Sequence, residues 1–311
     1  SSAATDLLSF VRLESDSALE SEVRRALQQP LDARRGPVMQ ATAIQSQTDG
    51  SVVLVFLFHH AFFDGLSSQL FLHELSAAYN GVELPELPLT YLDYSAHEHE
   101  LLRSEAAEPA KQWWRSHLQG AAQLVADLPV DRLRSLQRSA VGGRIKIALS
   151  RAVLEGMRAW RDEAKCSEFM VLLAVMQLFV HKISVTQQTD VCVGTVHANR
   201  YRLEFEQLIG MFVNTLPVRA AIDATRSFAE LQASVRQTWL QAAEHSFVPF
   251  DWMTSELHAF PPTTAATPFF QVLLWYATEA QMAMKLQLGD HPTTPFELPT
   301  SNDTQALFDL Q

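Results

Sequence analysis

The chain is poor in cysteine, has no long apolar run and carries fewer basic than acidic side chains. Its 311 residues include two cysteines, Cys166 and Cys192. The surrounding patterns place Cys166 in a helical stretch and Cys192 in a strand, and we expect two buried free thiols rather than a disulfide. Free thiols are typical of a reducing compartment, so we predict a cytoplasmic location.

No stretch of the sequence reaches the length of a transmembrane helix. Residues 1–6 (SSAATD) contain neither the basic region nor the apolar region of a signal peptide, and they include no initiator methionine. We therefore expect no membrane partner, and we expect the chain to be a piece of a longer polypeptide.

The charge balance is acidic, because 24 Lys and Arg residues face 35 Asp and Glu residues, for a net charge of −11. This sign argues against nucleic acid or an anionic membrane as the main partner. With 47% hydrophobic residues, the chain is long enough for one large or two ordinary domains.

Strands and helices alternate in both halves of the sequence, which predicts an α/β fold in two lobes. The first half predicts strands at residues 8–13, 38–45 and 51–58, and helices at residues 17–28, 67–79 and 92–118. The second half predicts strands at residues 144–149, 190–196 and 270–276, and helices at residues 153–164, 169–183 and 228–243. Residues 121–143 show little periodicity and are the best linker candidate.

The most informative motif is HHAFFDG at residues 59–65, directly after the apolar strand predicted at residues 51–58. A metal site is disfavoured because adjacent strand residues point to opposite faces and no Cys/His cluster supplies further ligands. A hydrolase triad is disfavoured because the sequence has no Gly-x-Ser-x-Gly elbow. A buried histidine pair bonded to backbone carbonyls is the plainest alternative.

The remaining reading is a single histidine that acts on a substrate nucleophile. His60 would reach into a channel, where an imidazole suits the role of a general base. Asp64 could orient the ring, or bond an arginine and hold the loop. Gly65 has no side chain, so it leaves room for a slender substrate arm and keeps a backbone N–H accessible.

Residues 59–65 resemble the His-His-x-x-x-Asp-Gly motif of condensation domains from nonribosomal peptide synthetases. This motif also occurs in relatives within the chloramphenicol-acetyltransferase-like superfamily, including epimerisation domains and free acyltransferases. Six further segments match the condensation-domain pattern in order: YLDY at 91–94, LPVDR at 128–132, DVCVGT with ANR at 190–200, IGMFVNT at 209–215, HSFVPF at 245–250 and PFFQV at 268–272. Six ordered matches are far more specific than any one of them.

The resemblance implies a V-shaped pseudo-dimer of two chloramphenicol-acetyltransferase-like lobes, here residues 1–125 and 126–311, with a central tunnel. Donor and acceptor carrier protein domains would dock at its mouths and insert phosphopantetheine arms, so that no cofactor is bound directly. The reaction would join a donor acyl thioester and an acceptor amine as an amide. Neighbouring synthetase domains would complete the parent, which could be a hybrid polyketide–peptide synthase.

The resemblance also assigns roles to individual residues. The catalytic motif comprises His60, Asp64 and Gly65, the candidate substrate contacts are Asn214 and Ser67, the supporting residues are His59 and Arg200, and no metal is expected. His60 would act as the base or orient the amine, and Asp64 is expected to be structural first. Asn214 would either donate to the substrate or brace a loop.

The sequence departs from the family pattern at both ends. The first two family motifs, a Ser-x-Ala-Gln-x-Arg opening and an Arg-His-x-x-Leu-Arg segment, are not found before residue 59, and the closing strand and helix are not found after Leu310. The missing arginine segment commonly provides the partner of the motif aspartate, which leaves Arg200 as the candidate. Ester formation, cyclising release and a carrier-docking scaffold without turnover remain open, and epimerisation is less favoured.

Overall fold

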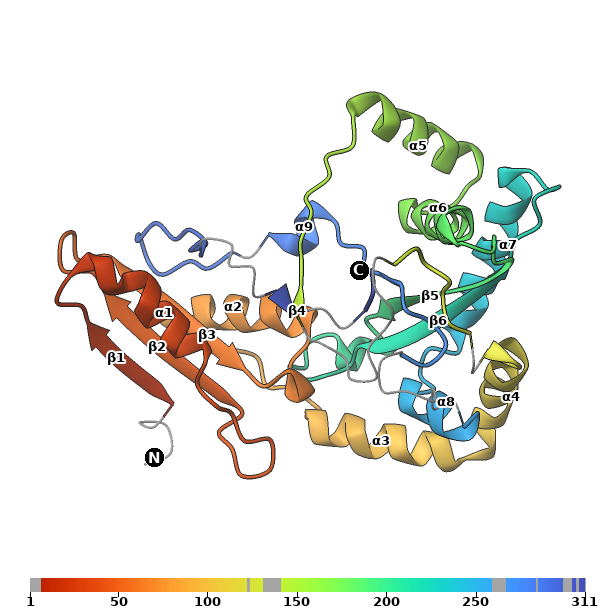
Figure 1. Cartoon of the computed structure of the whole chain (residues 1–311). Coiled ribbons are helices and arrows are strands. Elements are labelled where there is room, and N and C mark those ends of the chain that lie inside the picture. Colours follow the sequence, from red (N-terminus) through yellow and green to blue (C-terminus); the bar gives the residue numbers. More distant parts are fainter. Residues whose placement is uncertain are drawn as a thin grey trace. The chain divides into compact units, whose positions relative to one another are not determined.

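The computed structural model describes residues 7–121, 124–130, 141–258, 267–283, 285–298, 304–305 and 308–310. They pack as two compact units (Figure 1). The first unit draws on residues 1–91, 202–212 and 280–300, and the second on residues 92–201, 213–279 and 301–311. By this division, residues 92–121 and 124–125 fall in the second unit, and the predicted lobe boundary at residue 125 stays a prediction. The last two residues of the LPVDR segment, Asp131 and Arg132, lie outside the described residues.

The first unit is built on a sheet with the order β1-β2-β3, in which β1 is parallel to β2 and β2 is antiparallel to β3. Its elements are β1 (Leu8–Arg12), η1 (Asp16–Ala18), α1 (Leu19–Leu27), β2 (Met39–Gln45), β3 (Val52–Phe58), η2 (His60–Phe62), α2 (Gly65–Tyr79) and η5 (Leu203–Phe205). The predicted hairpin between residues 38–45 and 51–58 is confirmed, and Gly50 supplies the positive φ that its turn needs.

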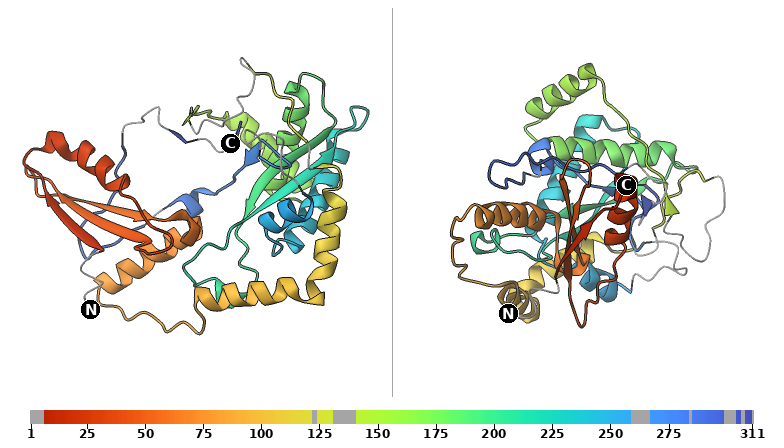
Figure 2. Two further views of the ribbon diagram at one scale, coloured as in Figure 1. Left: turned by 60° about the horizontal axis from the view of Figure 1, so that its bottom comes forward. Right: turned by 90° about the vertical axis from the view of Figure 1, so that its left-hand side faces the viewer.

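Helices cover both faces of this sheet (Figures 1 and 2). On one face, Ile44 and Val55 form a small core with Val23 of α1. On the opposite face, the ring of Phe71 on α2 meets Phe56 edge-on, with 5.1 Å between ring centroids. Strand β3 is therefore fixed from both sides, and the residues that follow it start from a defined position.

The second unit contains a sheet with the order β6-β5-β7 and a short β4-β8 pair. Its elements are α3 (Tyr91–Arg103, whose first residue belongs to the first unit), η3 (Glu105–Ala107), α4 (Glu108–His117), β4 (Val141–Gly142), α5 (Arg151–Glu163), α6 (Glu168–Ile183), β5 (Asp190–His197), β6 (Asn214–Ala221), α7 (Phe228–Glu244), α8 (Phe250–Glu256), β7 (Leu273–Leu274), α9 (Glu279–Met282, which runs into the first unit) and β8 (Thr304–Gln305).

Strand β5 is buried on both faces, which explains its nearly continuous apolar sequence. Val191 and Val193 pack in one cluster with residues of α6 and α7. Cys192 packs in another cluster with Trp114 of α4 and Phe270. Because Trp114 is fully buried in this second cluster, helix α4 is an integral part of the second unit.

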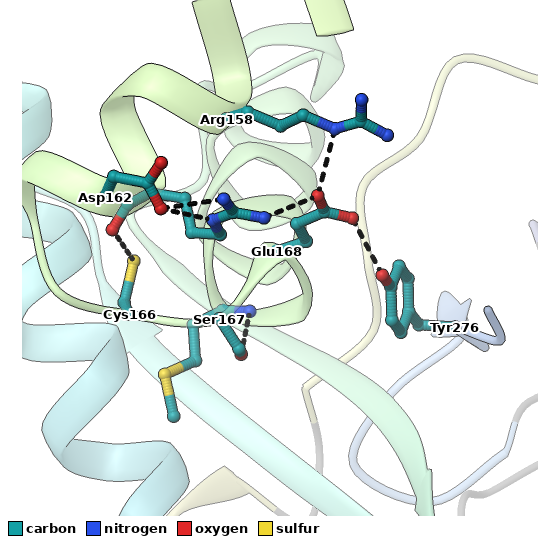
Figure 3. Close-up of polar contacts among 8 residues, drawn as sticks. Arg158, Asp162, Cys166, Ser167, Glu168 and Tyr276 are labelled. Carbon is teal, nitrogen blue, oxygen red and sulfur yellow. Dashed lines mark hydrogen bonds and ion pairs between the residues drawn. The ribbon is translucent and has the colours of Figure 1, made fainter. Parts of the chain in front are cut away.

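Helix α5 has no fully buried residue and is tied to its neighbours by charge. Glu168, the first residue of α6, accepts hydrogen bonds from Arg161 Nη1 at 2.9 Å and from the Tyr276 hydroxyl at 2.9 Å. Arg158 Nε lies 3.3 Å from the same carboxylate (Figure 3). These bonds lower the pKa of Glu168, the Tyr276 hydroxyl contributing most.

Several predicted elements differ from the structure. The strand predicted at residues 144–149 is wrong, since this segment forms no ladder and Ile145 and Ile147 are exposed. The helix predicted at 92–118 is divided into α3 and α4, and Pro109 lies in the first turn of α4, where proline is tolerated. The strand predicted at 270–276 shortens to β7. Strand β6 and helix α8 were not predicted.

Both cysteines are free, as predicted. Cys192 lies in β5 and is buried, and burial raises the pKa of its thiol. Cys166, however, is half-buried and lies in the connection between α5 and α6 rather than in a helix. Among the described residues, no single helix has the length and apolar character needed to cross a membrane, although α5 and α6 reach those limits together as a pair bent by 109°.

Two glycines should respond to alanine in opposite directions. A Cβ at Gly194 in β5 would overlap the buried ring of Phe270, whereas a Cβ at Gly156 in α5 would meet no atom within 4 Å. We expect Gly194→Ala to lower the free energy of unfolding by about 1–3 kcal/mol through overpacking. Gly156→Ala should raise it by about 0.5–1 kcal/mol through helix propensity. Urea denaturation followed by tryptophan fluorescence measures both, and equal signs would contradict this packing.

His117, the last residue of α4, should make the fold sensitive to acid. Burial lowers its pKa to about 4, from an ordinary value of 6.5. The unfolded chain therefore takes up this proton below about pH 6.5, but the folded chain does so only near pH 4. Stability contributed by the neutral ring is present above pH 6.5 and is lost as the pH falls, by about 2 kcal/mol between pH 7 and pH 5.

The matched variant is His117→Gln, because an amide oxygen can still accept the Arg219 N–H that His117 Nε2 accepts at 3.3 Å. We expect its free energy of unfolding to decline less between pH 7 and pH 5 than that of the wild type. The difference between the two declines isolates residue 117 from other histidines, such as His197, whose pKa burial also lowers. Parallel declines would rule out the buried neutral ring.

Candidate active site

His60 lies at the point where the first unit changes from strand to helix. Strand β3 ends at Phe58, the turn η2 covers residues 60–62, and α2 begins at Gly65. His59 starts this turn, and its Nδ1 accepts the Ala61 N–H at 3.2 Å. The ring of His59 thus bonds within the turn, and its supporting role stays a prediction, while His60 is exposed.

The ring of His60 is oriented by the main chain of its own turn. Its Nδ1 lies 3.0 Å from the carbonyl oxygen of Phe63. Because a carbonyl oxygen only accepts, Nδ1 carries the hydrogen, and the neutral ring has its lone pair on Nε2. The ring of Phe63 stacks on Phe58 with 3.7 Å between centroids, which holds the accepting carbonyl in place.

Asp64 is buried and bonds to groups on two segments. As the N-cap of α2, its Oδ1 accepts the Ser67 N–H at 2.8 Å. Its Oδ2 accepts the Phe212 N–H at 3.0 Å, a contact between residues 148 positions apart in the sequence. Capping and this long-range bond together fix the loop that carries His60.

Ser67 lies beneath this loop and is fully buried. Its Oγ is 2.8 Å from Asp64 Oδ1 and 2.8 Å from the Gly210 carbonyl oxygen, and it accepts the Gly210 N–H at 3.0 Å. Ser67, which the sequence analysis gave as a candidate substrate contact, therefore bonds Asp64 on one segment and Gly210 on another.

Tyr91 also contacts residues 210–212. Its hydroxyl donates to the Met211 carbonyl oxygen at 2.8 Å, and its ring meets Phe212 edge-on at 5.3 Å. A Cβ at Gly210 would overlap the Tyr91 ring, so the motif glycine is required by close packing. The sequence supplied Tyr91 and Gly210 only as letters of matched motifs and gave no contact between them.

Asn214 belongs to the second unit, where it is the first residue of β6 and is buried. Its Nδ2 donates to the carbonyl oxygens of Ser246 and Val248, both at 2.7 Å, and its Oδ1 accepts the Phe250 N–H at 3.0 Å. Both hydrogens of the amide group are thereby used to hold the segment that contains the HSFVPF motif.

A buried polar chain extends from this segment to helix α3. Ser246 Oγ lies 3.2 Å from Asn199 Oδ1, and Asn199 Nδ2 lies 3.4 Å from the Tyr94 hydroxyl. That hydroxyl donates to Glu98 Oε1 at 2.7 Å. Burial raises the pKa of Glu98, since the carboxylate is partly removed from water. Together with Asn214, residues of four matched motifs thus meet in one hydrogen-bonded cluster inside the second unit.

The other residues singled out by the sequence are Gly65, Arg200 and His245. Gly65 is exposed at the start of α2, and a Cβ there would meet no atom within 4 Å. Arg200 is half-buried and follows Asn199 in the second unit, and its pairing with Asp64 stays a prediction. His245 accepts a hydrogen bond from Trp114 Nε1 through its main-chain carbonyl at 2.9 Å. Among the described residues, no three His, Cys, Asp or Glu side chains are grouped so that they could hold a metal.

Comparison with known proteins places this geometry in a family. A family profile described as "Condensation domain" matches residues 4–311. A linear gramicidin synthase of Brevibacillus parabrevis is 33% identical over 298 residues, which cover 94% of this chain and 4% of that protein. Phosphinothricin tripeptide synthetase PhsC of Streptomyces viridochromogenes is 32% identical over 251 residues, which cover 79% of this chain and 23% of that protein.

Solved structures share the fold. The X-domain from teicoplanin biosynthesis, also solved in complex with OxyB, aligns with a TM-score of 0.75 at 24% identity over 86% of this chain and 60% of its own. The first condensation domain of the calcium-dependent antibiotic synthetase, in complex with a substrate analogue, aligns with a TM-score of 0.66 at 19% identity over 91% of this chain and 63% of its own. The fold is therefore a chloramphenicol-acetyltransferase-like α/β fold, and the chain belongs to the condensation-domain family.

Proposed function

We propose that the chain joins a donor acyl thioester to an acceptor amine as an amide, with both substrates carried on phosphopantetheine arms of carrier protein domains. The observation that supports this function best is the His60 ring, which is exposed and oriented through the Phe63 carbonyl so that the lone pair lies on Nε2. An oriented neutral imidazole suits proton removal from an attacking amine.

The reaction that we propose begins when the amine nitrogen attacks the thioester carbonyl carbon and a tetrahedral intermediate forms. The nitrogen loses a proton to His60 Nε2, the carbon–sulfur bond breaks, and the phosphopantetheine thiolate leaves and takes up that proton from His60 Nε2. If the amine arrives neutral, the same nitrogen of His60 can orient it by accepting a hydrogen bond, and positioning then supplies most of the acceleration.

The start of α2 offers donors for the charge on the thioester oxygen. Asp64 uses the Ser67 N–H, and among the hydrogen bonds of the described residues the amides of Gly65 and Leu66 have no acceptor. These are the first amides of a 15-residue helix, where the helix dipole favours negative charge. We propose that they stabilise the oxyanion.

Asp64 and Asn214 are proposed to hold the site rather than to touch substrate. Asp64 is 3% exposed and bonds main-chain amides on two segments. Both Nδ2 hydrogens of Asn214 go to main-chain carbonyls, so its geometry favours bracing over donation to a substrate. The carboxylate and the amide then serve the reaction by keeping loops in position.

The partners and the wider setting follow from the relatives. The chain spans 4% of the linear gramicidin synthase and 23% of the phosphinothricin synthetase, so the carriers and neighbouring domains of a longer synthetase are proposed as partners. The cytoplasmic location stays a prediction. A carrier-docking scaffold is the second candidate function, because the similar X-domain was solved in complex with another protein, OxyB. Product from loaded carriers favours the enzyme, and binding without product favours the scaffold.

His60→Ala should lower the rate of amide formation by about 10²–10⁴-fold, because it removes the proposed general base. Donor and acceptor carrier domains loaded with acyl and aminoacyl groups are mixed with each variant, and the product is followed by intact mass. The matched control is His73→Ala, which removes an exposed imidazole of the same unit from α2. Full activity of His60→Ala would eliminate the proposed role of this ring.

Asn214→Ala should mainly affect stability. It leaves the carbonyls of Ser246 and Val248 without their buried donor, and we expect the free energy of unfolding to fall by about 2–4 kcal/mol. Chemical denaturation measures this loss, and the product rate of the protein that remains folded should stay within a few-fold of wild type. A stable but inactive Asn214→Ala protein would instead favour the substrate contact.

A further inference from the structure

We propose that Ser67 is a positioning residue for the reaction, in that its hydroxyl locks the loop carrying His60 to residues 202–212 of the same unit. This inference rests on the proposed function for its effect on rate, and on the structure for the contact itself. The group formed by Asp64, Ser67, Tyr91 and residues 210–212 is called the clasp below.

The Ser67 hydroxyl is saturated by protein groups. Its single hydrogen can go to Asp64 Oδ1 or to the Gly210 carbonyl oxygen, both at 2.8 Å, while the oxygen accepts the Gly210 N–H at 3.0 Å. The side chain is fully buried, so water cannot replace these bonds. Such a hydroxyl holds protein segments together and is not available to a substrate arm.

The opposite half of the clasp is equally constrained. Each residue from 210 to 212 has a main-chain group bonded to a side chain of the first unit: Gly210 to Ser67, Met211 to Tyr91 and Phe212 to Asp64. The Tyr91 ring closes the space above Gly210. Residues 210–212 therefore form a fixed surface that determines the position of the loop carrying His60.

The clasp reaches the reacting groups through the main chain. The carbonyl that orients His60 belongs to Phe63, whose neighbour Asp64 is held by Ser67 and Phe212. The same carboxylate caps α2, whose first amides are the proposed oxyanion donors. Loss of the Ser67 hydroxyl would shift both groups together, and a displacement of about 1 Å can cost about 100-fold in rate.

The test compares Ser67→Ala with Ser68→Ala. Ser68 is the next residue of α2, and its hydroxyl bonds only the Asp64 carbonyl oxygen, at 3.4 Å, in the contacts that the structure describes. Hydrogen–deuterium exchange of peptides covering residues 59–68 and 204–213 is measured for both variants. We expect about tenfold faster exchange in both peptides for Ser67→Ala and little change for Ser68→Ala.

Kinetics with loaded carriers separates a positioning effect on kcat from a loss of carrier binding. In Ser67→Ala, kcat should fall about 10- to 100-fold while the KM for the acceptor carrier stays unchanged. The double variant His60→Ala with Ser67→Ala should lose less rate than the product of the two single losses, because part of the Ser67 effect acts through His60. If Ser67→Ala fails to fold, Tyr91→Phe replaces it, since this change removes the bond to Met211 and keeps the ring over Gly210.

The outcomes distinguish the clasp from the proposed function. Unchanged exchange in the two peptides would overturn the clasp whatever the activity. Faster exchange with wild-type kcat, or a double variant whose rate loss equals the full product of the two single losses, would overturn the positioning role. A wild-type protein that forms no product would instead contradict the proposed function, and the exchange data would still decide whether Ser67 joins the two segments.

Discussion

The site depends on one buried carboxylate that bonds groups far apart in the sequence. Asp64 caps α2 through the Ser67 amide and accepts the amide of Phe212, 148 residues later. A buried carboxylate is costly unless donors surround it, so the chain around it must adopt one arrangement. That arrangement sets the Phe63 carbonyl, and through it the ring of His60. The exposed turn that carries His60 is thus held in place by buried hydrogen bonds.

The second unit also joins distant segments through buried hydrogen bonds, mostly between uncharged groups. Asn214, Ser246, Asn199 and the Tyr94 hydroxyl form a buried chain of hydrogen bonds that ends on Glu98. Fully bonded polar clusters specify one arrangement because each unpaired member would carry a desolvation cost. In both units, therefore, motif residues distant in the sequence serve as buried connectors, whereas the ring of His60 is exposed.

Local patterns predicted most elements and failed where neighbours in space decide. The apolar run at residues 169–183 predicted α6, and the Ser67–Tyr79 pattern predicted α2 to within two residues of its start. Strand β6 escaped detection because Pro217 interrupts it, yet β6 is an edge strand of its sheet, where proline is tolerated. The alternating residues 144–149 predicted a strand, but no neighbouring strand pairs with them among the described residues.

The sequence by itself determined most of the strands and helices, the family and the position of the histidine motif, because residue periods, caps and motif spacing are local properties of the chain. Only the tertiary structure decided that Ser67 bonds Gly210, that Tyr91 fills the space above that glycine and that the Asn214 amide is used by Ser246 and Val248. The sequence does not indicate which group a hydroxyl or amide will bond. The hydrogen-bond partner depends on the packing that brings distant segments together and excludes water.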